Sequence, residues 1–134
     1  MKIKRFEDIE AWQLARELAR KVYRLTKKPR FAKDYGLKSQ IQDAAGSSMH
    51  NIAEGFDFET NAEFIRFLRY AKRSCTEVQS ELYLALDEEY ISAVEFKDVY
   101  EQSRRTRAAT YGFIKYLKKY KKTKPPTVNR ERGR

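Results

Sequence analysis

The sequence of 134 residues is poor in cysteine, histidine and glycine, and these shortages exclude several classes of protein and of binding site. A lone cysteine, Cys75, cannot form an internal disulfide, so a secreted scaffold held by disulfides is not indicated and a reducing cytoplasm is expected. No apolar run reaches the length of a membrane span, and the first residues do not resemble a signal peptide. We therefore expect one soluble, cytoplasmic domain that has no membrane segment and no disulfide framework.

Few residues in this sequence are suited to catalysis or to metal binding. The five glycines are too far apart to form a phosphate-binding loop, and one histidine with one cysteine provides no zinc signature. His50 and Glu54 lie one helical turn apart and could form a His–carboxylate pair, but no nucleophile or oxyanion arrangement accompanies them. The sequence therefore predicts a protein that is not an enzyme and has neither cofactor nor metal.

Four amphipathic stretches, at about 8–28, 35–54, 60–87 and 92–121, carry apolar residues at three- and four-residue steps. No alternating strand pattern competes with them, so the sequence predicts an all-α protein, an antiparallel up-and-down bundle of four helices. We expect the four inner stripes to consist of the following residues: Trp12, Ala15, Leu18, Ala19, Val22 and Leu25; Leu37, Ile41, Ala45, Ser48 and Ile52; Phe64, Phe67, Leu68, Ala71, Cys75, Val78, Leu82 and Ala85; and Phe96, Val99, Thr106, Thr110, Phe113 and Leu117.

Helix boundaries are marked by capping residues. The segments 60–63 and 92–95 read Thr-Asn-Ala-Glu and Ser-Ala-Val-Glu, which is the capping-box pattern that opens a helix. Pro29 is expected to end the first helix, and Gly55 is expected to cap the second one. Gly112 lies inside the fourth helix and costs about 1 kcal/mol relative to alanine.

Phenylalanines are also placed near the expected helix ends rather than on the inner stripes, at positions 6, 31, 56 and 58. Two interpretations are open. They mark contacts between subunits, or they belong to loops that pack over the ends of the bundle.

The net charge of +10 is confined to one part of the chain. Residues 1–100 contain 17 basic and 17 acidic side chains, whereas residues 101–134 contain 12 basic and two acidic ones. Clustered positive charge favours a polyanionic partner, because binding releases the counterions of that partner.

The fourth helix has a basic face opposite its core face. Seven basic residues and one tyrosine form the predicted nucleic-acid contact surface, and no base-reading motif accompanies them. The third helix repeats the pattern more weakly, with arginines at 66, 69 and 73, but Glu63 and Glu77 share that face and an ordinary solvated surface is the preferred interpretation. We assign the bundle to residues 1–122 and a basic, disordered tail to residues 123–134. The predicted contact residues are Arg104, Arg105, Arg107, Tyr111, Lys115, Lys118, Lys119 and Lys122.

Five blocks of sequence occur in an order that is distinctive. They read FEDIEAWQ from position 6, GLKSQI from 36, NIAEGF from 51, EFIRFL from 63 and AKRSCTE from 71. In this order they resemble the 23S rRNA-intervening sequence protein family of bacterial four-helix bundles. Many members of that family have a proline before the third block, where this chain has Ser48-Met49-His50, so a helix distortion found elsewhere is not expected here.

The resemblance implies an antiparallel four-helix bundle that assembles into a ring-shaped homopentamer. It also implies an RNA partner, since members are often encoded within ribosomal RNA genes. Related proteins are accessory subunits of diversity-generating retroelements, which bind a reverse transcriptase and its RNA. We therefore expect a non-enzymatic RNA-binding protein, and the alternative is a scaffold that docks a reverse transcriptase. The family has no motif that would assign a catalytic residue.

Overall fold

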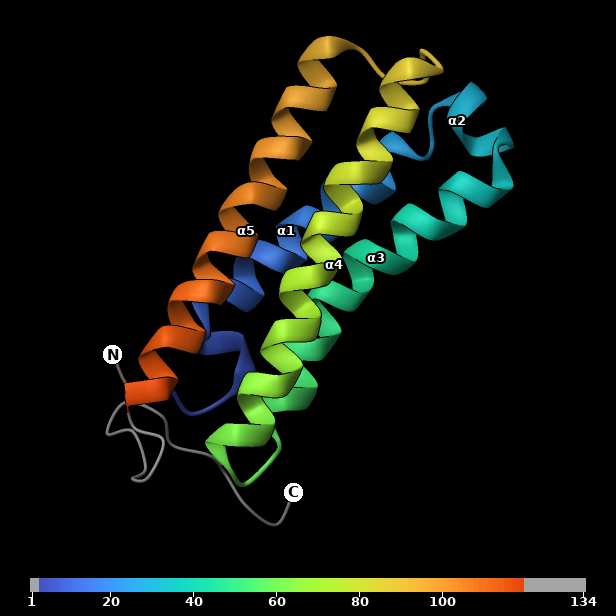
Figure 1. Ribbon diagram of the computed structural model, residues 1–134. Coiled ribbons are helices and arrows are strands. Elements are labelled where there is room, and N and C mark those ends of the chain that lie inside the picture. Colours follow the sequence, from blue (N-terminus) through green and yellow to red (C-terminus); the bar gives the residue numbers. More distant parts are fainter. Residues whose placement is uncertain (1–2, 120–134) are drawn as a thin grey trace.

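The computed structural model describes residues 3–119, and this part of the chain is helical, without β-strands. Four long helices are joined by short connections, and consecutive long helices run in opposite directions (Figure 1). The predicted all-α fold is therefore confirmed. The elements are η1 (Phe6–Asp8, a 3-10 helix), α1 (Glu10–Leu25), α2 (Pro29–Lys33), α3 (Tyr35–Phe56), α4 (Asn61–Asp87) and α5 (Ala93–Lys119).

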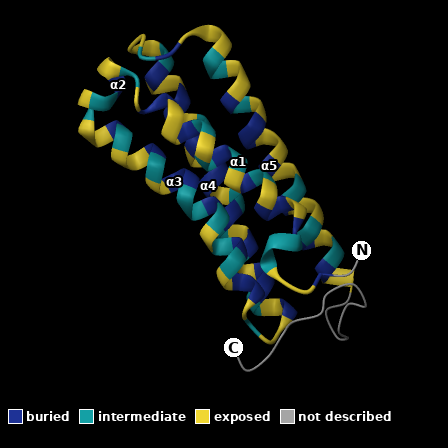
Figure 2. Ribbon diagram, turned by 180° about the vertical axis from the view of Figure 1, so that it is seen from behind, coloured by how far each residue is buried: buried dark blue, intermediate teal, exposed yellow. Residues whose placement is uncertain are grey.

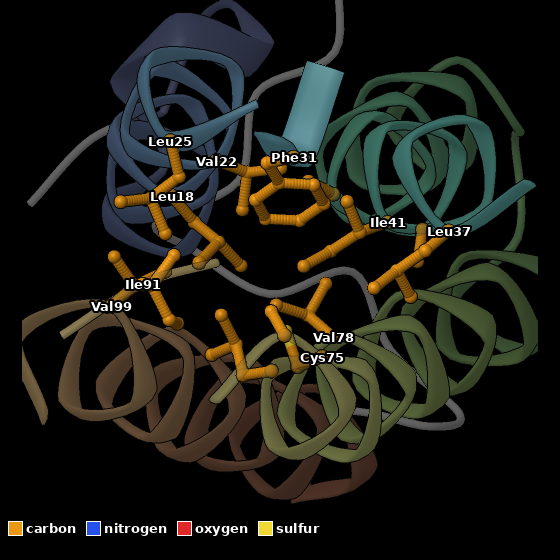
Figure 3. Close-up of a cluster of buried hydrophobic side chains, with 14 residues drawn as sticks. Leu18, Val22, Leu25, Phe31, Leu37, Ile41, Cys75, Val78, Ile91 and Val99 are labelled. Atoms are coloured by element: carbon orange, nitrogen blue, oxygen red, sulfur yellow. The ribbon is translucent and has the colours of Figure 1, made fainter. Parts of the chain in front are cut away.

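Each long helix packs against two others. The helix α3 contacts α1 and α4, and α5 contacts α4 and α1, so the contact between α1 and α5 closes the bundle. Buried residues face the interior and exposed residues lie outside on all four helices (Figure 2). In the part of the core shown in Figure 3, side chains from all four long helices and from α2 converge, among them Leu18, Phe31, Ile41, Val78 and Val99.

The predicted inner stripes form the core with few exceptions. Those of α1, α3 and α4 are buried apart from Ala19 and Phe67, which are partly buried. On α5, Phe96 and Phe113 are also only partly buried, and Ile114 is buried instead. The sequence pattern therefore located the core faces well.

Polar residues fill the core along the middle of α5, where the stripe is weakly apolar. Gln102 donates to the carbonyl of Leu14, 3.0 Å away, and Ser103 donates to the carbonyl of Cys75, 2.8 Å away. Thr106 and Thr110 bond to carbonyls one turn earlier in α5. These bonds satisfy the buried hydroxyl and amide groups, so a polar helix centre is compatible with a packed core.

The two predicted capping boxes differ in the structure. At the start of α5, the backbone N–H of Ser92 donates to Glu95 Oε1 (2.8 Å) while the N–H of Glu95 donates to Ser92 Oγ (3.1 Å), so this box is reciprocal. At the start of α4, Thr60 Oγ1 accepts the N–H of Glu63, and the carboxylate of Glu63 bonds to Arg66.

Two expectations about helix ends were wrong. The helix α1 ends at Leu25, and Pro29 begins the unpredicted helix α2, because proline fits the first position of a helix, where no N–H bond is required. Gly55 does not cap α3, which continues to Phe56. Gly55 is buried inside the helix, and a Cβ there would lie 2.9 Å from Phe64 Cδ1 and from Phe67 Cβ.

The phenylalanines near the helix ends pack within the chain. Phe31 and Phe56 are fully buried, Phe6 meets Trp12 edge to face, and Phe58 contacts Phe67. This favours the interpretation in which loops and helix ends cover the bundle. No helix in residues 3–119 combines the length and the apolarity needed to cross a bilayer.

Candidate nucleic-acid interface

A basic groove runs between the first half of α4 and the second half of α5. It has a volume of about 440 Å³. Five of its eight lining side chains are cationic, two are tyrosines and one is isoleucine, and no acidic residue lines it. We call it the α4–α5 groove, and its residues are Arg66, Arg69, Tyr70, Lys72, Arg73, Tyr111, Ile114 and Lys118.

Helical periodicity explains why these side chains meet. Residues three or four positions apart on a helix lie on one face, so Arg66, Arg69 and Arg73 share a face of α4. The same spacing places Tyr111 and Lys118 on one face of α5, and Ile114 between them is buried. Because α4 and α5 pack side by side, the two faces border a single groove.

Two tyrosine rings form cation–π contacts with the cations of this region. Lys72 Nζ of α4 lies 4.8 Å from the centroid of the Tyr111 ring on α5, and Lys115 Nζ lies 5.1 Å from the same centroid. The guanidinium of Arg73 lies 5.1 Å from the Tyr70 ring, and that of Arg66 lies 5.6 Å from it. Cations are attracted to aromatic faces, and this attraction leaves their charge intact.

Carboxylates neutralise only the margins of the basic surface. Glu63 binds Arg66 through two hydrogen bonds, which lower the pKa of Glu63 and raise the pKa of Arg66. Glu101 likewise binds Arg104, at the other margin. Within residues 3–119, no ion pair involves the other cations at the groove, which are Arg69, Lys72, Arg73, Lys118 and, at the Tyr111 ring, Lys115.

The structure divides the predicted contact residues into three groups. Tyr111 and Lys118 line the groove, and Lys115 lies at the Tyr111 ring. Arg107 is exposed on α5 and donates to Thr76 Oγ1 of α4, 3.1 Å away, so it too faces the junction of the two helices. The exposed residues Arg104, Arg105 and Lys119 do not line the groove, and Lys122 lies outside the described residues, as does the predicted tail.

The α4 residues of the groove were not predicted to belong to the contact surface. Arg69 and Arg73 were visible as a weak basic stripe, but Glu63 and Glu77 on the same face favoured an ordinary solvated surface. In the structure, Glu63 accepts hydrogen bonds from Arg66 and not from Arg69 or Arg73, and Glu77 does not line the groove. No pattern in the sequence indicates a role for Lys72, because only tertiary packing places it against Tyr111.

The other chemical candidates lie away from this surface. Cys75 is fully buried, and burial raises the pKa of its thiol to about 12, which fits the expected core role. His50 and Glu54 are exposed on α3. In residues 3–119, no three His, Cys, Asp or Glu side chains are grouped so that they could hold a metal ion.

Two comparisons with known proteins find a match. The family model described as 23S rRNA-intervening sequence protein matches residues 7–112. A crystal structure from Bacteroides thetaiotaomicron, described as a protein with unknown function from the S23 ribosomal protein family, superposes with a TM-score of 0.73. That chain is 24% identical, and the match covers 78% of this chain and 98% of that one, which supports the fold. No curated protein matches this sequence.

Proposed function

This chain belongs to the 23S rRNA-intervening sequence protein family, and on that basis we propose that it is a non-enzymatic RNA-binding protein. Its contact surface consists of the α4–α5 groove and the adjoining basic residues of α5. One observation carries the proposal. A groove without an acidic lining residue is bordered by five cations from two helices that form no ion pair within the described residues, namely Arg69, Lys72, Arg73, Lys115 and Lys118. Only Arg66, a sixth cation of the groove, is paired, with Glu63.

The physical support is electrostatic. An RNA strand is a linear polyanion, and each phosphate that a lysine or arginine neutralises releases condensed counterions. Arg69 and Arg73 add planar guanidinium groups, which can bond two phosphate oxygens at once. The predicted contact residues Arg105, Arg107 and Lys119 extend the same positive field along α5.

The proposal is tested by removing three charges from the groove. We expect the variant Arg69→Gln/Arg73→Gln/Lys118→Gln to bind RNA at least about tenfold more weakly at low salt. The slope of log affinity against log salt should also decrease, by about 0.7 for each phosphate that the variant no longer neutralises. Fluorescence anisotropy with a labelled RNA at several salt concentrations measures both quantities.

A charge-matched control separates local contact from net charge. The variant Lys27→Gln/Lys33→Gln/Lys97→Gln removes the same number of charges from exposed residues that do not line the groove. It should retain nearly the full affinity and slope. Equal losses in the two triple variants, or RNA affinity that does not depend on salt, would contradict the proposal.

A second candidate function is that of a scaffold, an accessory subunit that docks a reverse transcriptase. An aromatic surface at the other end of α4 and α5 favours it. Tyr83 is 50% exposed, and its ring lies 4.9 Å from that of Phe96 and 5.9 Å from that of Tyr100. Capture of the reverse transcriptase that survives nuclease treatment, and that Tyr83→Ser abolishes, would support this function over direct RNA binding.

We further propose that the chain assembles into a ring-shaped homopentamer, as its resemblance to the family implies. Exposed Leu84 and Val94, at 53% and 79%, are apolar side chains available for such contacts. Light scattering should then give a mass five times that of the 15.9 kDa chain. A stable monomer at micromolar concentration would contradict the ring.

A further inference from the structure

The α4–α5 groove has room for one unpaired nucleotide. A volume of about 440 Å³ lies in the range of small-ligand sites, which hold a ligand between walls. Duplex RNA is recognised mainly by its shape and through phosphates and 2′-hydroxyls, for which no recess is needed. A recess between two helices can enclose a base only if that base is unpaired.

The groove also has the surfaces that a base requires. Tyr70 from α4 and Tyr111 from α5 supply aromatic rings, and the buried Ile114 lies between the groove and the core. Tyr111 is 47% exposed although it is large and aromatic, and the ammonium groups of two lysines lie near its ring. A base that stacks on this ring would cover apolar surface that the folded chain leaves in water.

The cations surround these rings at positions suited to the adjoining phosphates. Arg69 and Arg73 lie one turn apart on α4, and Lys118 faces them from α5. A ligand that consists only of phosphate would be bound by the cations and would make no use of the aromatic rings. The combination of stacking rings and cations is typical of sites for single-stranded nucleic acid.

We propose that the α4–α5 groove binds one unpaired nucleotide of an RNA strand, with its base stacked on Tyr111 and its phosphates held by Arg69, Arg73 and Lys118. The inference rests on the proposed RNA-binding function and specifies that the bound RNA is single-stranded. It predicts a preference for single strands that does not depend on charge.

The test replaces the ring and keeps every charge. Wild type and Tyr111→Leu are compared by anisotropy with a labelled 12-nucleotide oligouridylate and with a blunt 12-base-pair RNA duplex. The variant should bind the single strand about five- to a hundredfold more weakly, as expected for the loss of one stacked base, and should bind the duplex unchanged. Tyr111→Phe should retain single-strand affinity, since it keeps the ring.

A matched control and a competitor complete the design. Tyr35→Leu changes another exposed tyrosine, which is 75% exposed at the start of α3, and should not affect either affinity. Inorganic polyphosphate carries the charge without the bases and should compete less well than oligouridylate at equal phosphate concentration. Circular dichroism establishes that each variant is folded.

The outcomes separate this inference from the function on which it rests. If the wild type binds neither RNA, the proposed function fails. If it binds both RNAs while Tyr111→Leu changes neither affinity or lowers both equally, only the nucleotide site is overturned. Photo-crosslinking of a 4-thiouridine oligonucleotide to the wild-type protein gives an independent result without any substitution. A crosslink on a groove residue supports the site, and crosslinks found only elsewhere overturn it.

Discussion

Gly55 and Gly112 show how the same residue can have opposite effects at two positions in a helix. At Gly55, a methyl group would overlap Phe64 and Phe67, both near the start of α4, so the absence of a side chain allows α3 and α4 to approach closely. At Gly112, no atom lies within 4 Å of an added Cβ, so glycine there has only its entropic cost.

The two alanine variants should therefore change stability in opposite directions. Gly55→Ala should lower the free energy of unfolding by about 1–3 kcal/mol, because Phe67 Cβ is close to the backbone and cannot turn aside. Gly112→Ala should raise it by about 0.5–1 kcal/mol. Urea denaturation followed by circular dichroism measures both, and a stable Gly55→Ala variant would disprove the close approach.

Glu81 is a carboxyl group in an unfavourable place. Only 9% of the residue is exposed, and its Oε1 atom has no hydrogen-bond partner in the part of the chain that the structure describes. Burial raises its pKa to about 7, and the nearby charges of Glu77 and Asp43 contribute in the same direction. Glu81 is therefore protonated in the folded protein over a range in which the unfolded chain is ionised.

This difference makes stability depend on pH. Between about pH 4.5 and pH 7, the folded state binds one more proton at Glu81 than the unfolded state, so the free energy of unfolding falls as the pH rises. Glu81→Gln should remove this pH-dependent loss. Its free energy of unfolding should decrease between pH 5 and pH 8 by about 1–2 kcal/mol less than that of the wild type. Denaturation at the two pH values tests this, with exposed Glu88→Gln as the control. A pH dependence identical to that of the wild type would contradict the assignment.

At the scale of the element, α5 is held at its start by interactions with two parts of the chain. Glu95 Oε1 accepts the N–H of Ser92, and the same carboxylate binds Lys28, which follows α1, at 2.9 Å. These bonds, first the one from Ser92 and then the one from Lys28, lower the pKa of Glu95. The cap therefore also ties α5 to the end of α1.

Removal of the serine hydroxyl tests the local half of this arrangement. Ser92→Ala should lower the free energy of unfolding by about 1 kcal/mol, because the N–H of Glu95 loses its acceptor. The backbone N–H of Ser92 remains, so its bond to Glu95 is retained. Thr60→Ala provides the comparison at α4, where the hydroxyl accepts in the same way. A Ser92→Ala variant as stable as the wild type would show that the Ser92 hydroxyl contributes nothing to stability.

At the scale of the whole molecule, we expect folding and part of the positive charge to be separable. Residues 3–119 contain two buried clusters, and the sequence of residues 120–134 adds six basic side chains and one acidic one. The surface that is proposed to contact RNA therefore includes the groove and is followed in sequence by further positive charge.

A chain that ends at Lys119 should keep its thermal unfolding temperature and lose part of its RNA affinity. The loss should grow as the salt concentration falls, because long-range attraction by the deleted charges is screened at high salt. Differential scanning fluorimetry and anisotropy on the same preparation measure the two effects. If the shortened chain unfolds at a much lower temperature, folding and charge are not separable.

The sequence by itself determined the helices, most of their inner faces and the position of the excess charge. These features are local: periodicity places Leu68 and Ala71 on one face, Ser92 and Glu95 cap a helix within one turn, and α4 ends at Asp87 as the stripe predicts. The basic face of α5 could be identified for the same reason.

Tertiary structure decided what depends on residues far apart in the chain. Lys72 meets Tyr111, and the arginines of α4 join Lys118, only because α4 and α5 pack side by side. Gly55 is needed where α3 approaches α4, and burial between helices perturbs Glu81. A pattern along one helix does not record which residues its neighbours present, so the sequence indicated a basic surface and packing made it a groove.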